Sequence, residues 1–529
     1  MNVFTMPLRK RGTRRPVAVR LGAVAVAAAL ATVLAACGGS PDAAGSGGGA
    51  GSTLTIGYDS DPAPTGYDPL RYSPGQRQFY ESLYDSLFVQ TADGGVEPGL
   101  VADFSYSADN TQLTLTLRDG VTFADGSPLD ATLVKANLDR RADPELTSYT
   151  AFAPGGEAEI VDVQAPDPRT VVITTATPQA SLHILLTGVP GMIVGPTGVA
   201  DPASLATTPD GSGPYTLDAD ATIKGSSYVV VEKPGHPDAA GHPFDTVVHK
   251  AILDGQARAN AMVSGQVDAA LLTPDAVDLV ESRGVAIERV GGTVVNLAVF
   301  DKTGAIHPAF GDVRVRQAIQ HAIDRETLVA TLHEGDEPTA NAFPAAAEGH
   351  DPALDAQWGH DPQRARELLA EAGYADGFSF DVVTSPPTMT DMQAIQAQLA
   401  EVGITMNVRT AASTEELFAS VETQPLGYFP LSWTDPLGIV QGVVVGGFLN
   451  LQQASDPAIS DALGRAAAAT GDARAEALTD LNAALVAQGW MIPLYESYSY
   501  WAYDADTLQK VTFSGTDQYP LLAAFRPTT

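Results

Sequence analysis

The sequence predicts an α/β protein of two or three lobes, in which at least one pair of strands is parallel. Three observations support this fold class. Segments in which apolar and polar residues alternate, as in strands, are interspersed with segments of helical period. Residues 378–383, 389–402 and 404–409 read as strand, helix and strand, which implies parallel strands with a right-handed crossover. The chain has 529 residues, too many for a single hydrophobic core.

The N-terminal residues 1–36 have the pattern of an export signal, in which a basic segment precedes an apolar run. The run ends in Leu34-Ala35-Ala36-Cys37, as in lipoprotein signals, and Cys37 is the only cysteine of the chain. We expect Cys37 to become the lipid-modified first residue of the mature chain, followed by a Gly/Ser-rich tether over residues 37–52. Arg14-Arg15 leaves Sec and twin-arginine export both open.

The net charge of the chain is strongly negative, −33 at neutral pH. Removal of the export signal, which carries six basic and no acidic residues, makes it −39. A body of this charge repels nucleic acids and anionic lipid headgroups, so neither is expected as a partner. Contact with a membrane is expected through the lipid of Cys37 alone.

The first half of the mature chain alternates strands and helices. A strand is expected at 53–58, a helix at 76–88 and a strand at 113–117 with its leucines on one face. Asp119-Gly120 predicts a turn, after which the alternation resumes at Val121 and Phe123 as the second strand of a hairpin. Asp130 is the expected N-cap of the next helix. Two further strands are expected within residues 161–175, around the Asp167-Pro168 turn.

The second half begins with a strand at 294–300 and a single long helix at 312–332. Asp361 as N-cap, Pro362 at the first helical position and Gly373 past the end bracket the next helix. After the strand–helix–strand unit, helices are expected near 456–469 and 472–488, with a final strand at 492–495.

Several of these segments resemble one protein family. The matching segments are residues 97–102, 117–126 and 129–131, the turn Gly211-Ser212-Gly213-Pro214-Tyr215, residues 313–325 and 361–374, and Ile492-Pro493-Leu494-Tyr495. They resemble the signature of family 5 extracytoplasmic solute-binding proteins, the oligopeptide, dipeptide and nickel receptors of ABC importers. The resemblance covers nearly all of the mature chain.

The resemblance implies a periplasmic-binding-protein-like clamp of two lobes with an extra subdomain, built from mixed sheets with helices on both faces. Lobe I would comprise residues 53–76, 210–292 and 491–529, the extra subdomain residues 77–209, and lobe II residues 293–490. A solute, most simply a peptide, would be captured between the lobes and delivered to permease subunits with their ATPases. The family further implies an extracytoplasmic monomer without catalytic activity or cofactor, either in a periplasm or on the outer face of a single-membrane cell.

The ligand-binding residues follow from the same resemblance. Peptide-binding members hold the ligand as an added strand and pair an aspartate with its α-amine. In the matching segment 428–437, Trp433 would offer an aromatic face and Asp435 a negative charge that is buried on closure. The alternatives are that Trp433 packs in the core and that Asp435 closes a turn before Pro436. The other residues implied are Tyr428, Tyr58, Asp59 and Ser60.

Catalytic and metal sites are not expected. The spacing around Ser212 is not that of a nucleophile elbow, and His333-Glu334 lacks the second histidine of a zinc protease. The spacing of His236, His242 and His249 would allow histidines on loops to bind a metal ion. Because His236 and His242 precede prolines in turns and His249 lies in a strand, a metal site is not expected from them. Three other functions stay open: a receptor for a metal chelate, sugar or other small solute, an exported hydrolase, and a surface lipoprotein that only contacts proteins.

Overall fold

The computed structural model describes residues 52–71, 75–91, 95–141, 152, 159–179, 182–433, 436–469, 471–514 and 517–528. The export signal, Cys37 and all but the last residue of the tether lie outside the described residues, as does Asp435. Among the helices of the described ranges, none is long and apolar enough to cross a membrane.

A nine-stranded mixed sheet organises the molecule, in the order β16-β12-β17-β11-β1-β10-β9-β8, with β13 paired to β17. β1 is parallel to β10 and β11, and the other pairs are antiparallel. The strands are β1 Thr53–Tyr58, β8 Tyr215–Leu217, β9 Ser227–Glu232, β10 Thr246–Ala251, β11 Ala269–Leu272, β12 Ala286–Val299, β13 Glu337–Pro338, β16 Leu426–Ser432 and β17 Met491–Tyr503.

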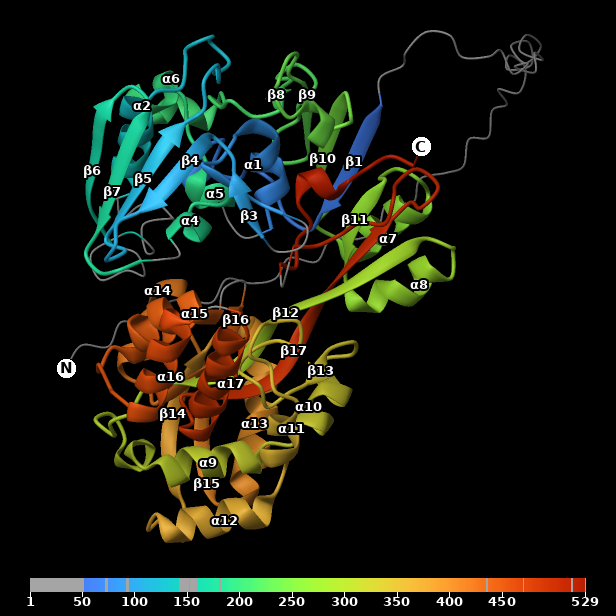
Figure 1. Ribbon diagram of the computed structural model, residues 1–529. Helices are drawn as coiled ribbons and strands as arrows, with labels where there is room; N and C mark the ends of the chain where they lie inside the picture. The colour runs from blue at the N-terminus through green and yellow to red at the C-terminus, as the bar shows by residue number, and fades with distance from the viewer. Residues whose placement is uncertain are drawn as a thin grey trace, which may run out of the picture. The chain divides into compact units, whose positions relative to one another are not determined.

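The two longest strands, β12 and β17, run antiparallel to each other (Figure 1). They link separate hydrophobic clusters. Residues 286–287 of β12 and 500–503 of β17 pack in clusters with β1 and β11. Residues 294–299 and 491–495 pack in two other clusters, with the helices that follow β12 and with those that precede β17. Between these stretches, only Tyr498 packs against a hydrophobic cluster. We call residues 288–293 and 496–499 the crossing segment.

A second sheet is antiparallel, in the order β4-β5-β7-β6, and has its own core. Its strands are β4 Val101–Tyr106, β5 Gln112–Leu117, β6 Ile160–Asp167 and β7 Thr170–Thr175, and α2 Ala131–Arg140 packs into the same core. The predicted strand at 113–117 is confirmed, because Leu113, Leu115 and Leu117 are buried together. The predicted cap is confirmed as well, since Asp130 Oδ1 accepts a hydrogen bond from the backbone of Leu133 at 2.8 Å.

The predicted strand–helix–strand unit is confirmed as β14 Phe378–Thr384, α13 Met389–Glu401 and β15 Ile404–Thr410, with β14 and β15 parallel. The preceding α12, Pro362–Glu371, begins as predicted with Asp361 as N-cap and Pro362 in its first turn. Gly373 adopts the positive φ of +89° typical of a helix end. Local capping chemistry therefore determines these boundaries.

Three sequence predictions are wrong in detail. The helix expected at 76–88 is α1 Arg77–Leu83, because Tyr84 is extended and Phe88 begins β2 Phe88–Gln90, which pairs with β3 Val96–Pro98. The helix expected at 312–332 is divided into α9 Val313–Ala322 and α10 Arg325–Leu332 by Asp324, which caps the second helix. Residues 121–123 form no strand, although Gly120 has the expected positive φ, because β5 pairs instead with β4 and β7.

The remaining α-helices and one π-helix of the described residues complete the cores. They are α4 Leu182–Leu185, α5 Gly188–Gly191, α6 Pro196–Ala200, α7 Gly255–Val263, α8 Val277–Glu281, α11 Ala353–Gln357, α14 Thr414–Ala419, α15 Pro436–Ile439, a π-helix at Val440–Val445, α16 Pro457–Ala468 and α17 Asp472–Ala487. The mixed α/β fold class predicted from the sequence is thus confirmed.

Candidate functional site

The residues predicted after the first strand have different environments. Tyr58 is buried, and its hydroxyl lies 2.9 Å from Nδ1 of His249, on which its ring stacks at 5.7 Å. Burial raises the pKa of Tyr58 well above its usual value, and the negative charge of Glu81 raises it further. Asp59 is exposed and Ser60 is half-buried. In this structure Tyr58 therefore belongs to the core, and only Asp59 and Ser60 are open to solvent.

Trp433 directly follows β16 and is completely buried. Its ring packs against Phe343 with centroids 4.9 Å apart, and its backbone N–H donates to the carbonyl of Gly292 at 2.9 Å. The aromatic face proposed for a ligand is thus covered by the protein in this conformation. Its predicted neighbour Asp435 lies outside the described residues.

Tyr428 lies in β16, the strand that Trp433 follows, but the two side chains pack in different hydrophobic clusters. Its hydroxyl hydrogen-bonds to that of Tyr495, and burial raises its pKa above the ordinary value. Side chains alternate between the two faces of a strand, so residues five apart point to opposite faces. Tyr428 and Trp433 therefore do not share one ligand surface, and the alternation could have shown this from the sequence.

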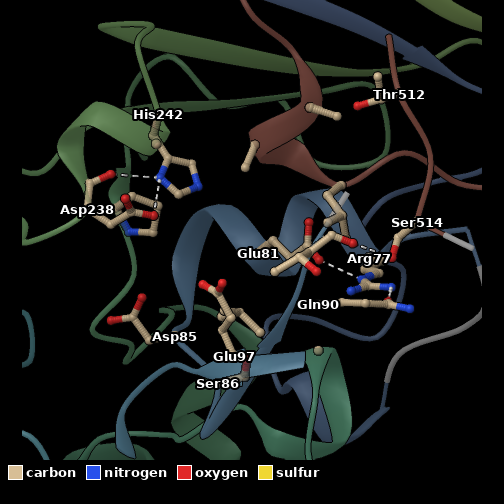
Figure 2. Close-up of a pocket in the computed structure, with 18 of the residues that line it drawn as sticks. Arg77, Glu81, Asp85, Ser86, Gln90, Glu97, Asp238, His242, Thr512 and Ser514 are labelled. Carbon is tan, nitrogen blue, oxygen red and sulfur yellow. Dashed lines mark hydrogen bonds and ion pairs between the residues drawn. The ribbon is translucent and has the colours of Figure 1, made fainter. Parts of the chain in front are cut away.

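A pocket of about 540 Å³ lies between α1, β2, β3, the short 3₁₀-helix Ala239–Gly241 and C-terminal residues 509–526 (Figure 2). Arg77 of α1 is its central cation. Its Nε lies 2.5 Å from Glu81, and its Nη1 lies 2.5 Å from Asp517 and 3.1 Å from the side-chain oxygen of Gln90. Glu81 also accepts the backbone N–H of Leu522 at 2.9 Å. This group fastens the C-terminal residues to α1.

The opposite wall of the pocket carries Asp85, Asp238 and His242. Asp85 accepts a hydrogen bond from Ser212 at 2.8 Å and lies 3.3 Å from Nε2 of His236. Burial raises the pKa of Asp85, but these two partners and the charge of Lys233 outweigh it, so the pKa lies below the usual range. The carboxylate is therefore charged at neutral pH.

Both signs of charge line this pocket. The acidic residues are Glu81, Asp85, Glu97 and Asp238, and the basic ones are Arg77, Lys510 and Arg526. Such a lining can bind a polar solute that carries both charges. Ser212, the partner of Asp85, donates its hydroxyl proton to this carboxylate and not to a histidine. Among the described residues, no group of three or more His, Cys, Asp or Glu side chains could hold a metal ion.

The sequence alone did not point to this pocket. None of Trp433, Tyr58, Asp59, Ser60 and Tyr428 lines it. The spacing of Arg77 and Glu81 is that of an i,i+4 helix pair, which is visible in the sequence. Asp517 lies 440 residues from Arg77, and no sequence signal links the two.

Three comparisons relate the chain to known proteins. A model of the family described as bacterial extracellular solute-binding proteins, family 5, middle, matches residues 95–439. The glutathione-binding protein GsiB of Salmonella paratyphi A is 31% identical over 353 residues. That alignment covers 65% of this chain and 66% of GsiB, just under two thirds of the relative's own length.

Solved structures share the fold. HbpA2 from Haemophilus parasuis matches with a TM-score of 0.75 at 20% identity, covering 90% of this chain and 100% of that one. The periplasmic binding protein DppA from Helicobacter pylori, in complex with the peptide STSA, matches with a TM-score of 0.71 at 20% identity, covering 89% and 98%. At this identity the likeness shows the fold, which is that of periplasmic binding proteins.

Proposed function

The chain belongs to family 5 of the bacterial extracellular solute-binding proteins, and from this membership we propose that it is the solute-binding receptor of an ABC importer. The observation that carries the proposal is the family match over residues 95–439, more than half of the chain. The receptor captures a peptide between two lobes and delivers it to permease subunits that work with ATPases. It has no catalytic activity of its own.

The proposed lobes agree with the hydrophobic clusters except at two places: residues 491–495 of lobe I pack with lobe II, and α1 and residues 189–194 of the extra subdomain pack with β1. Lobe I comprises residues 53–76, 210–292 and 491–529, lobe II residues 293–490, and the extra subdomain residues 77–209. In support, β12 and β17 pass from the clusters of residues 286–287 and 500–503 to those of residues 294–299 and 491–495. A connection of two paired strands without a core of its own is suited to bending while the lobes stay rigid.

Peptides are the proposed ligand class, and glutathione, itself a tripeptide, is the first to test. GsiB, the relative at 31% identity, is named as a glutathione-binding protein, and the structure of DppA contains a bound peptide. Trp433 and Asp435 remain the proposed contacts, Asp435 with the ligand's amine, together with Asp59 and Ser60. For Trp433 to serve, the loop that carries it must rearrange so that its ring leaves Phe343.

The membrane association proposed is a lipid on Cys37, with residues 37–52 as a tether for a monomeric body on the outer side of the cell membrane. The pattern Leu34-Ala35-Ala36-Cys37 supports it. Mass spectrometry of the protein from its own cells tests it: an N-terminal peptide that begins at an acylated Cys37 is expected. An unmodified Cys37 would refute the anchor without affecting the ligand proposal.

A thermal-shift series tests the ligand class. The chain from residue 37 with Cys37→Ser is heated with glutathione, a set of di- to pentapeptides, nickel chelates and sugars. A ligand at a hundredfold excess over its Kd should stabilise the protein by roughly 2.7 kcal/mol. Stabilisation by peptides is expected. A response to sugars or chelates only would contradict the peptide proposal, and turnover of a ligand would favour an exported hydrolase.

A further inference from the structure

The crossing segment contains a glycine pair that gives it an irregular backbone. The register between β12 and β17 shifts between Val290 and Thr293, so that Gly291 and Gly292 together face a single residue of β17. Gly292 has φ +136°, a conformation that other residues rarely adopt. The carbonyl of Gly292 accepts the backbone N–H of Trp433. The end of β16 therefore depends on the geometry of this bulge.

Gln518 reaches the same place from the C-terminal residues. Its side-chain oxygen accepts a hydrogen bond from the Thr293 hydroxyl at 3.0 Å, and its amide nitrogen donates to the carbonyl of Ser497 at 2.9 Å. The Ser497 carbonyl can only accept, so it fixes which way the amide points. The side chain thus bridges β12 and β17 within the crossing segment.

The chain of hydrogen bonds continues into β16. The Thr293 and Ser432 hydroxyls lie 2.8 Å apart. Because the single proton of Thr293 goes to Gln518, the Ser432 hydroxyl must be the donor in this second bond. A directed series therefore runs from Ser432, beside Trp433, through Thr293 to Gln518.

Contacts with the part of the protein that contains β1 hold the backbone of Gln518 in place. Its carbonyl accepts the indole N–H of Trp501 at 3.0 Å, and Trp501 is buried in the cluster that contains β1. The preceding residue, Asp517, pairs with Arg77 on α1 at 2.5 Å. Gln518 thus has its backbone in proposed lobe I and its side chain on the first residue of proposed lobe II.

We propose that Ser432, Thr293, Gln518 and Ser497 form a hinge clasp. Gln518 is its positioning residue and sets the equilibrium between lobe arrangements. Through Thr293 and Ser432, the clasp couples this equilibrium to the end of β16 that carries the proposed ligand contacts. The proposal rests on the receptor function proposed above. Bending at the glycine bulge moves Thr293 and Ser497 relative to the anchored backbone of Gln518, so the two hydrogen bonds of its side chain hold one arrangement against the others.

The test measures the distance between the lobes directly. Cys37 is the only native cysteine, so a Cys37→Ser chain can be spin-labelled at Ala221→Cys in lobe I and Ala370→Cys on α12, both exposed positions. Gln518→Leu should shift the ratio of lobe arrangements by roughly tenfold, the equivalent of one to two net hydrogen bonds. Gln509→Leu is the matched control, because Gln509 bonds only within the C-terminal segment, to Pro527.

A distance distribution for Gln518→Leu that superimposes on the parent would overturn the clasp, as would an equal shift in Gln509→Leu. Thr293→Val removes the same bond from the other side, so the shifts of the two variants should not add in the double variant; additive shifts would also overturn it. These measurements need no ligand, so they decide the clasp even if no peptide binds. With glutathione as probe, Gln518→Leu should change the Kd by the same factor as the population.

Discussion

Substituting Gly291 by alanine is the sharpest structural test of the crossing segment. A Cβ at this position would lie 2.0 Å from Oε1 of Glu496 and 2.9 Å from the ring of Tyr498. Glu496 is 4% exposed, and its two carboxylate oxygens accept the backbone N–H groups of Gly292 at 3.0 Å and Ala345 at 2.8 Å. The carboxylate must therefore turn away and lose at least the first of these bonds.

The expected cost follows from the bond lost. A hydrogen bond to a charged group contributes about 1.5–3 kcal/mol, and the residual crowding adds to it, so Gly291→Ala should lower the free energy of unfolding by about 3 kcal/mol. Gly464→Ala is the matched control. Gly464 lies inside α16 with nothing near its would-be Cβ, and this change should stabilise by about 0.5–1 kcal/mol.

Urea unfolding followed by circular dichroism measures both variants. If Glu496 causes the loss, Gly291→Ala should cost less than about 1 kcal/mol in a Glu496→Ala background, because the clash with Glu496 and the bond are then both absent and only the close contact with Tyr498 is left. A Gly291→Ala variant as stable as the parent, or the same large cost in both backgrounds, would refute this account of the crossing segment.

Three further predictions concern the site and the core. Asp435→Asn should weaken a free-amine peptide by at least about tenfold in calorimetric titration and leave its N-acetylated form unchanged; equal losses would remove Asp435 from the amine site. Burial lowers the pKa of His249 to about 3, so the folded state keeps it neutral while the unfolded chain binds a proton below about pH 6.5. Stability is then complete above pH 6.5 and falls as the pH decreases towards 3. Between pH 6.5 and 5 the parent should lose about 2 kcal/mol more than His249→Phe, and parallel pH profiles would contradict this. Arg77→Met should cost about 2 kcal/mol because it leaves Glu81 and Asp517 without their shared cation, whereas Arg364→Met, at a more exposed pair, should cost under about 1 kcal/mol; equal costs would argue against a role in fastening the C-terminal residues.

The parts of the fold that follow local chemistry were predictable from the sequence. Asp130, Asp361 and Gly373 mark helix ends because a cap or a positive φ needs those residue types. The break at Asp324 was missed even though the same chemistry is present there, because the apolar residues on both sides continue the helical period. A cap inside a periodic stretch is a boundary that hydrophobic periodicity alone conceals.

The hinge clasp was less predictable, because its residues are brought together by the order of the strands in the sheet. Thr293 meets Ser432 because β12 pairs with β16, and Gln518 reaches Thr293 and Ser497 only after the chain has returned through β17. Local patterns contain no information on such pairings. The opposite orientation of Tyr428 and Trp433 is different, since the alternation of β16 alone determines it.

As a two-lobe receptor, the proposed function of this protein, the chain should close on a small solute. Small-angle X-ray scattering on the Cys37→Ser chain, with and without the peptide that gives the largest thermal shift, tests this closure most directly. A smaller radius of gyration in the presence of that peptide is expected, with the peptide recovered unchanged. A radius of gyration that stays the same with every stabilising solute would contradict the proposal.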